Sequence, residues 1–271
     1  MRIARFSAGS DPQYGVVELP EDGQDHPNTI AVLTGDPLSM PVQLTGERHD
    51  LEAVRLLAPV LPRSKVIAVG RNYVAHAEEM GSDIPEVPLT FFKPNTAIIG
   101  PGDPVIFPPG CTELSYEGEL AVVIGRICKD VPIERVPEVI FGYTIANDMT
   151  ARDFQRSDGQ WARAKGFDTS LPLGPWIITH LSLEEAGDVY IRTTVDGEER
   201  QSDSTKLMVR SISDLVSWIS EWTTLLPGDL ILTGTPAGVG PVEAGQEVSV
   251  TIEGMGTLTN PVLADDQEGK Q

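Results

Sequence analysis

The stretch that decides the fold of this 271-residue chain runs from Ser115 to Ile124 and reads SYEGELAVVI. Two acidic residues are followed by an apolar run, a pattern typical of a strand that enters a core. Side chains two positions apart in a strand point to the same face, roughly 7 Å from each other, so Glu117 and Glu119 would lie side by side. Such a pair is costly to bury, because the carboxylates repel each other and lose their water. A bound divalent cation would remove both costs.

A third carboxylate follows a second apolar run, residues 141–147, which ends at Asp148. If the two runs are neighbouring strands, Asp148 joins the pair. Three carboxylates suit Mg²⁺, Mn²⁺ or Ca²⁺ and leave coordination positions for water and substrate. The alternative is an exposed strand edge, on which charges at Glu117 and Glu119 only block aggregation.

Composition places the chain among soluble globular proteins, with 40% hydrophobic and 22% charged residues. No apolar stretch approaches the roughly 20 residues of a membrane helix, and the first residues lack the apolar run of a signal peptide. Cys111 and Cys128 are too few for a disulfide framework, so we expect a cytoplasmic protein.

The formal net charge of −20 argues against a nucleic-acid partner, because the phosphate backbone would be repelled. An anionic substrate would need positive charge concentrated at its binding site. The expected cation, Arg152 and Lys165 are the candidates for that charge.

The strand patterns predict a β-dominated α+β fold. We expect a small β-rich N-terminal domain over 1–62, a catalytic domain over 63–263 and a flexible tail over 264–271. Strands outnumber helices and do not alternate with them, which argues against a doubly wound sheet. One clear helical stripe recurs through 212–222, ending at Trp222; Ser211 or Ser213 would cap its start, and Pro227 and Gly228 would stop it.

The segment 70–81, GRNYVAHAEEMG, follows a predicted strand and contains a histidine and a glutamate three residues apart. Asn72 would cap a short helix that Gly81 ends. On that helix His76 and Glu79 share a face, and a carboxylate beside an imidazole suits a general base that activates water. The alternative is a surface helix on which Glu79 is merely solvated. So short a helix could also act as a lid over a substrate.

Two further segments carry candidate substrate contacts. Arg152 follows Asp148 by four residues, so it forms either an ordinary ion pair with Asp148 or a bidentate clamp on a substrate carboxylate, with Gln155 assisting. Lys165, between small residues, could stabilise the negative charge of an enolate oxygen. The loop 232–240, which contains Thr235, could offer backbone N–H groups to an oxyanion, or it is a plain connection.

Taken together, these motifs resemble those of the fumarylacetoacetate hydrolase superfamily, in particular its short bacterial members with a compact N-terminal segment. The matching motifs are Gly70-Arg-Asn-Tyr-x-x-His76, Phe92-Lys93-Pro94, Tyr116-Glu-Gly-Glu-Leu120, Gly142-Tyr-Thr-x-x-Asn-Asp-Met-Thr-Ala-Arg-Asp153, Lys165-Gly-Phe-Asp168 and Thr233-Gly-Thr-Pro236.

The resemblance implies a mixed β-roll core, a homodimer, and one Mg²⁺ or Mn²⁺. It assigns the metal to Glu117, Glu119 and Asp148. It makes His76 and Glu79 a lid dyad that activates water, and it assigns substrate contacts to Arg152, Gln155, Lys165 and Thr235.

The activity that the resemblance implies is cleavage of a carbon–carbon bond in 2-oxo or 2,4-dioxo acids through an enolate held on the metal. Hydrolysis of an acylpyruvate such as fumarylpyruvate and decarboxylation of oxaloacetate are examples. One alternative is isomerisation of 2-hydroxyhepta-2,4-diene-1,7-dioate in aromatic catabolism. A remote alternative is a non-catalytic, metal-stabilised binding protein.

Overall fold

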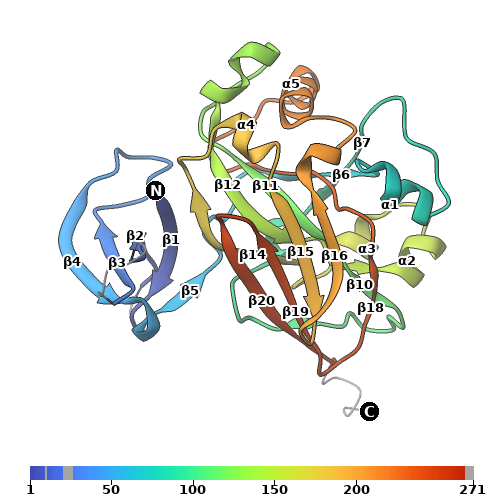
Figure 1. Ribbon diagram of the computed structural model, residues 1–271, viewed down its shortest axis with the longest axis horizontal. Coiled ribbons are helices and arrows are strands. Elements are labelled where there is room, and N and C mark those ends of the chain that lie inside the picture. The colour runs from blue at the N-terminus through green and yellow to red at the C-terminus, as the bar shows by residue number, and fades with distance from the viewer. Residues whose placement is uncertain (10, 21–26, 266–271) are drawn as a thin grey trace.

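Three β-sheets make up most of the fold in the computed structural model, which describes residues 1–9, 11–20 and 27–265 (Figure 1). The α-helices of the described chain are short, and none of them is long and apolar enough to cross a membrane. The expectation of a strand-dominated α+β fold is therefore confirmed. Of the tail predicted over 264–271, the part from residue 266 onward lies outside the described residues.

The largest sheet has 12 strands, in the order β4-β3-β2-β1-β14-β12-β11-β17-β6-β7, with β5 paired to β1 and β8 paired to β14. Their bounds are β1 Arg2–Ser7, β2 Gln13–Glu18, β3 Thr29–Leu33, β4 Leu44–Asp50, β5 Arg55–Leu57, β6 Val66–Gly70, β7 Leu89–Lys93, β8 Ile98–Ile99, β11 Gly118–Ile124, β12 Ile140–Asn147, β14 Leu171–Ile178 and β17 Leu230–Leu232.

Two smaller sheets complete the β structure. A three-stranded sheet has the order β13-β10-β18, and a five-stranded sheet has the order β16-β15-β19-β20-β9. Their bounds are β9 Val105–Ile106, β10 Leu114–Tyr116, β13 Thr150–Ala151, β15 Tyr190–Val195, β16 Glu198–Ser204, β18 Gly240–Val242, β19 Glu247–Ile252 and β20 Gly256–Leu263.

The N-terminal strands β1 to β5 lie at one side of the molecule, on the left of Figure 1, away from the helices α1 to α3. They join the rest of the large sheet through an antiparallel pairing of β1 with β14. They also bury an apolar cluster of their own, formed by Ala4, Phe6, Val17, Ile30 and Val32.

Five α-helices occur in the described part of the chain: α1 Val74–Glu79, α2 Arg152–Ser157, α3 Ala162–Gly166, α4 Leu183–Ala186 and α5 Ile212–Trp222. The cap predicted at Ser211 is confirmed, because its side chain accepts from the N–H of Asp214 in a capping box. The predicted stop at Pro227 was too late. The chain turns extended at Thr223, and Trp222, expected in the apolar stripe, is 42% exposed.

The sequence predicted one strand from Ser115 to Ile124, but the structure has two, β10 and β11. Strand β10 belongs to the three-stranded sheet and β11 to the large sheet, and Glu117 lies between them. The neighbouring segment also changes sheet, since β12 in the large sheet is followed by Asp148 and then by β13 in the three-stranded sheet. Because β10 pairs with β13 and β11 pairs with β12, two neighbouring segments cross together from one sheet to the other. We call this place the sheet crossing.

Candidate functional site

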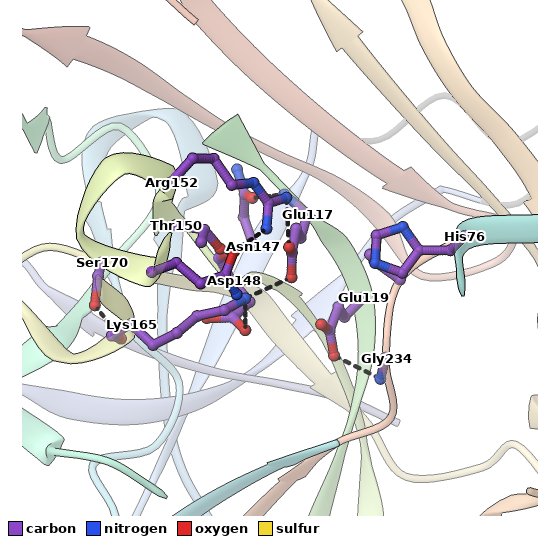
Figure 2. A network of polar contacts seen from close by, with 12 residues as sticks. His76, Glu117, Glu119, Asn147, Asp148, Thr150, Arg152, Lys165, Ser170 and Gly234 are labelled. Carbon is purple, nitrogen blue, oxygen red and sulfur yellow. Dashed lines mark hydrogen bonds and ion pairs between the residues drawn. The ribbon is translucent and has the colours of Figure 1, made fainter. Parts of the chain in front are cut away.

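The sheet crossing brings the three predicted carboxylates together. Glu117, Glu119 and Asp148 are all buried, and each offers an oxygen within 4.8 Å of the oxygens of the other two. The backbone explains the alignment: Gly118 pairs with Asn147, and the N–H of Asp148 donates to the carbonyl of Glu117 at 2.8 Å. Figure 2 shows that residues from separate segments, among them His76, Lys165 and Gly234, lie around this group.

Two buried lysines hold two of these carboxylates. Lys165 Nζ donates to Glu117 Oε2 at 2.6 Å and to Asp148 Oδ2 at 2.7 Å. Lys93 Nζ donates to Asp148 Oδ1 at 2.6 Å and also to the carbonyl oxygens of Lys165 and Ser170. The sequence assigned no role to Lys93. Its signal was a lysine directly after the apolar residues of a strand, and the structure shows that it fixes Asp148.

Arg152 also serves the carboxylates. Its Nη2 donates to Glu117 Oε1 at 2.7 Å, and its Nη1 donates to Gln155 Oε1 at 3.0 Å. The alternative ion pair between Arg152 and Asp148 was wrong, because Asp148 precedes β13 while Arg152 begins α2, so the two do not share a helix. The guanidinium is thus oriented by two side chains before any ligand arrives.

The surroundings shift the pKa values of Glu117 and Glu119 in opposite directions. Burial raises the pKa of Glu117, but Lys165 and Arg152 outweigh it and lower that pKa to about 2. Burial, and then the negative charges of Asp148 and Glu117, raise the pKa of Glu119 well above its ordinary value. In the described part of the chain Glu119 accepts only the backbone N–H of Gly234, at 2.7 Å, and no cationic side chain bonds to it.

This arrangement fits a hard dication. All of its donors are carboxylate oxygens, the donor type that Mg²⁺ and Mn²⁺ prefer. Three cationic side chains, Lys93, Lys165 and Arg152, pair with Glu117 and Asp148, so the cluster carries no excess of negative charge by itself. A dication would give it net positive charge in a protein of net charge −20.

The imidazole of His76, on α1, is buried on the other side of the carboxylates from Lys165 in the view of Figure 2. Burial is the main cause that lowers its pKa. Its Nδ1 lies 3.6 Å from Glu79 Oε2, which is too far for a hydrogen bond, and Nδ1 has no partner among the described residues. The Glu79 carboxylate instead accepts the N–H of Gly238.

The predicted cap of α1 by Asn72 was wrong. Tyr73 precedes the helix and makes no side-chain cap, while the Asn72 amide donates to the carbonyls of Thr233 and Arg210. The predicted end is confirmed, since α1 finishes before Gly81, whose φ is +61°.

The loop around Thr235 is hydrogen-bonded to the start of strand β11. Thr235 Oγ1 donates to the carbonyl of Gly118 at 2.8 Å. The fully buried Gln201 donates to Thr235 Oγ1 and to the carbonyl of Pro236, both at 2.8 Å, and accepts the N–H of Gly118 at 3.0 Å. Sequence reasoning missed Gln201, because a single glutamine in a polar strand carries no signal. Within the loop 232–240, whose N–H groups could have faced an oxyanion, the N–H of Gly234 donates to Glu119.

A cavity of about 230 Å³ opens over these groups. Every predicted site residue except Glu79 lines it: His76, Glu117, Glu119, Asp148, Arg152, Gln155, Lys165 and Thr235. The rest of its wall is formed by Val69, Gly70, Arg71, Met80, Ser82, Phe91 and Trp161. It therefore joins a charged floor to partly apolar walls, as small-molecule sites do.

Two family models match the chain. Residues 65–263 match the family described as "Fumarylacetoacetate (FAA) hydrolase C-terminal", and residues 1–59 match "Rv2993c-like, N-terminal". Among curated relatives, Protein Rv2993c of Mycobacterium tuberculosis is 51% identical over 97% of this chain and 98% of its own length. The human mitochondrial oxaloacetate tautomerase FAHD2A is 42% identical over 78% of this chain and 70% of its own length.

Solved structures agree with the fold. A 2-hydroxyhepta-2,4-diene-1,7-dioate isomerase from Mycobacterium marinum superposes with a TM-score of 0.88 at 47% identity, over 98% of this chain and 99% of the other. A fumarylpyruvate hydrolase from Pseudomonas aeruginosa, in complex with Mn²⁺ and pyruvate, superposes with a TM-score of 0.71 at 37% identity, over 77% and 91% of the two chains.

Proposed function

The chain belongs to the fumarylacetoacetate hydrolase family, and on this premise we propose that it is a Mg²⁺- or Mn²⁺-dependent enzyme that cleaves a carbon–carbon bond of 2-oxo or 2,4-dioxo acids. Hydrolysis of an acylpyruvate such as fumarylpyruvate is the reaction we favour. One observation carries the proposal: three buried carboxylates meet within 4.8 Å in a cavity that His76 and Lys165 also line.

Glu117, Glu119 and Asp148 would hold the metal, since they are the only cluster of this kind found in the described chain. A bound dication supplies Lewis acidity to the oxygens of a 2-oxo acid. The protein's own part is to present the three oxygens in fixed positions. Lys165, Lys93 and Arg152 do this by restraining Glu117 and Asp148, and the N–H of Gly234 restrains Glu119.

His76 would act as the general base. Burial lowers its pKa, so the imidazole is neutral at neutral pH and can take a proton from water. The water oxygen then attacks the distal carbonyl of the acylpyruvate, and the bond between that carbonyl and the methylene carbon breaks. The electron pair passes to the pyruvate enolate, which takes up a proton to give pyruvate, while the acyl group leaves as a carboxylate.

Lys165 would stabilise the charge that develops on the enolate oxygen. Burial opposes its charge, but the carboxylates of Asp148 and Glu117 outweigh burial and raise its pKa. Lys165 therefore stays an ammonium and is already oriented by two hydrogen bonds. A charge oriented in advance in a buried site stabilises a transition state without reorganisation.

Isomerisation of 2-hydroxyhepta-2,4-diene-1,7-dioate is the second candidate. Its support is the similarity to the isomerase structure over nearly the whole chain. That reaction shifts a proton and needs no attacking water. Decarboxylation of oxaloacetate likewise needs no nucleophile. A non-catalytic binding protein has the least support, because metal binding alone would not require the buried His76.

We test the proposal by steady-state assays on acetylpyruvate, fumarylpyruvate, oxaloacetate and the dienedioate, each with and without Mn²⁺. We expect metal-dependent cleavage of an acylpyruvate, and loss of this activity in Glu119→Gln, which keeps the shape of the side chain and removes its charge. Turnover of the dienedioate alone would identify the isomerase. If the protein bound Mn²⁺ but turned over none of the substrates, the non-catalytic binding protein would be the remaining alternative.

We further propose that the protein acts on its small anionic substrate as a homodimer in the cytoplasm, without a nucleic-acid or membrane partner. Analytical ultracentrifugation tests the dimer, since the chain has a mass of 29.3 kDa and the dimer would sediment at twice that mass.

A further inference from the structure

Arg71 is an unpaired cation in the wall of the cavity. It follows the last residue of β6 and lines the same cavity as the three carboxylates. No hydrogen bond or ion pair joins its side chain to any residue that the structure describes, whereas Arg152 and Lys165 are bound to Glu117. The protein carries 40 acidic and 20 basic residues, so a guanidinium without a carboxylate partner is unexpected at this place.

The backbone of Arg71 is held in an unfavourable conformation. Its φ is +58°, in the left-handed region that bulky side chains rarely adopt. The strand before it is paired on both sides, with β7 and β17. After it, Asn72 is fixed by hydrogen bonds to Thr233 and to both backbone groups of Arg210. Strain that the surroundings maintain in this way is concentrated at ligand sites.

We propose that Arg71 binds a second carboxylate of the substrate, so that the site selects 2-oxo acids with a carboxylate at the distal end of the carbon chain. This inference rests on the proposed function, which places the 2-oxo acid group at Glu117, Glu119 and Asp148. The planar guanidinium matches a carboxylate with two parallel hydrogen bonds. The apolar walls formed by Val69, Met80, Phe91 and Trp161 suit the carbon chain between the two ends.

The charges support the same assignment. Lys93, Lys165 and Arg152 are each already bound to Glu117 or Asp148, so a second anionic group needs a further positive charge. Arg71 provides that charge within the same cavity. An acylpyruvate with a methyl group at its distal end would leave the guanidinium unpaired, whereas a dicarboxylate would pair it.

The experiment compares two unreactive ligands of equal chain length, 2-oxoheptanedioate and 2-oxoheptanoate, which differ only in a distal carboxylate or methyl group. Calorimetry with the Mn²⁺-loaded protein should show the dicarboxylate binding about tenfold tighter or more. Arg71→Gly removes the guanidinium and relieves the strained φ, so it should fold. It should bind both ligands with the affinity of the wild type for 2-oxoheptanoate.

Arg126→Ala is the matched control, because Arg126 also lacks an ion pair among the described residues and lines a different cavity. It should keep the preference of the wild type. The inference is overturned if the wild type binds both ligands equally or binds neither. It is overturned as well if Arg71→Gly keeps the preference or weakens both ligands alike.

The reaction and the role of Arg71 can fail separately. A wild-type protein that cleaves acetylpyruvate as well as fumarylpyruvate would keep the reaction and overturn the selectivity. A protein that turns over no 2-oxo acid, yet shows a binding preference that depends on Arg71, would overturn the reaction and support the role of Arg71.

Discussion

Lys165 and Glu117 form a buried ion pair, with 2.6 Å between Nζ and Oε2. The same ammonium reaches Asp148 at 2.7 Å, so one cationic side chain spans two of the three carboxylates. The two roles proposed for Lys165, as a restraint on the carboxylates and as a group that stabilises an enolate, can be separated by experiment.

Replacement of Lys165 by methionine should separate them. Removal of one positive charge leaves the carboxylates more negative, so Mn²⁺ should bind at least as tightly as in the wild type. The kcat for acylpyruvate cleavage should fall by about 100-fold, because the developing enolate loses its buried cation. Calorimetry and steady-state kinetics measure the two effects, with exposed Lys129→Met as the control. Loss of Mn²⁺ binding would show that Lys165 mainly holds the carboxylates in place.

Replacement of His76 by glutamine should distinguish reactions that need activated water from those that do not. Hydrolysis of an acylpyruvate should fall by about 10²- to 10⁴-fold, the contribution of a general base. Decarboxylation of oxaloacetate, which requires no attacking water, should remain near the wild-type rate. Both rates are measured on the same Mn²⁺-loaded sample. Unchanged hydrolysis would exclude His76 as the base.

The pH dependence of hydrolysis should also test whether His76 is the general base. A general base must be neutral to accept a proton, and burial lowers the pKa of His76 below its ordinary 6.5. The midpoint of the acidic limb of the kcat/KM profile for hydrolysis should therefore lie below pH 6.5, with more than half of the maximal value retained at that pH. Saturating Mn²⁺, verified by titration at each pH, excludes an effect of metal loss. A half-maximal rate at or above pH 6.5 would contradict the assignment.

Replacement of Gln201 by leucine should affect both stability and substrate binding. The change leaves the buried N–H of Gly118 and the carbonyl of Pro236 without their partner, which should lower the free energy of unfolding by about 2 kcal/mol. Since Thr235 also loses a hydrogen bond, the KM should rise more than the kcat falls. Urea unfolding and kinetics measure these effects, and exposed Gln43→Leu is the control. A stability loss with unchanged KM would limit Gln201 to a structural role.

A buried ion pair away from the site should affect stability alone. Asp229 is fully buried, accepts Lys65 Nζ at 2.8 Å, and also accepts the N–H groups of Lys65 and Leu226. Asp229→Ala should lower the free energy of unfolding by about 3 kcal/mol, because a cation and two N–H groups lose their acceptor. Asp229→Asn, which keeps an acceptor oxygen, should lose less. Chemical denaturation measures both, and kcat below the unfolding transition should match the wild type.

Much of the carboxylate cluster could be predicted because its signal is local. Glu117 and Glu119 precede an apolar run, Asp148 ends another, and adjacent runs of this kind tend to pair. What the pattern could not show is the change of sheet at Glu117. A period of two residues tells which face a side chain takes and not which sheet the strand joins.

Contacts over long distances in the chain were beyond sequence reasoning. Lys93 reaches Asp148 from 55 residues away, and Gln201 reaches Gly118 from 83 residues away, so no spacing rule connects them. The alternative pairing of Arg152 with Asp148 was wrong for the same reason, since Arg152 instead binds Glu117, which lies farther away in the chain. A lid over residues 72–81 remains a prediction, to be tested by hydrogen exchange with and without ligand.

The sheet crossing has a mechanical consequence. Glu117 lies where one chain segment passes from one sheet to another, and Asp148 lies at the same point of the neighbouring segment. A dication bound there would link the two sheets, and its binding free energy would add to the free energy needed to open them locally. A fluctuation that separated the two sheets would then also release the bound ion. The concentration of the free ion in the cell would therefore affect how long the sheet crossing stays closed.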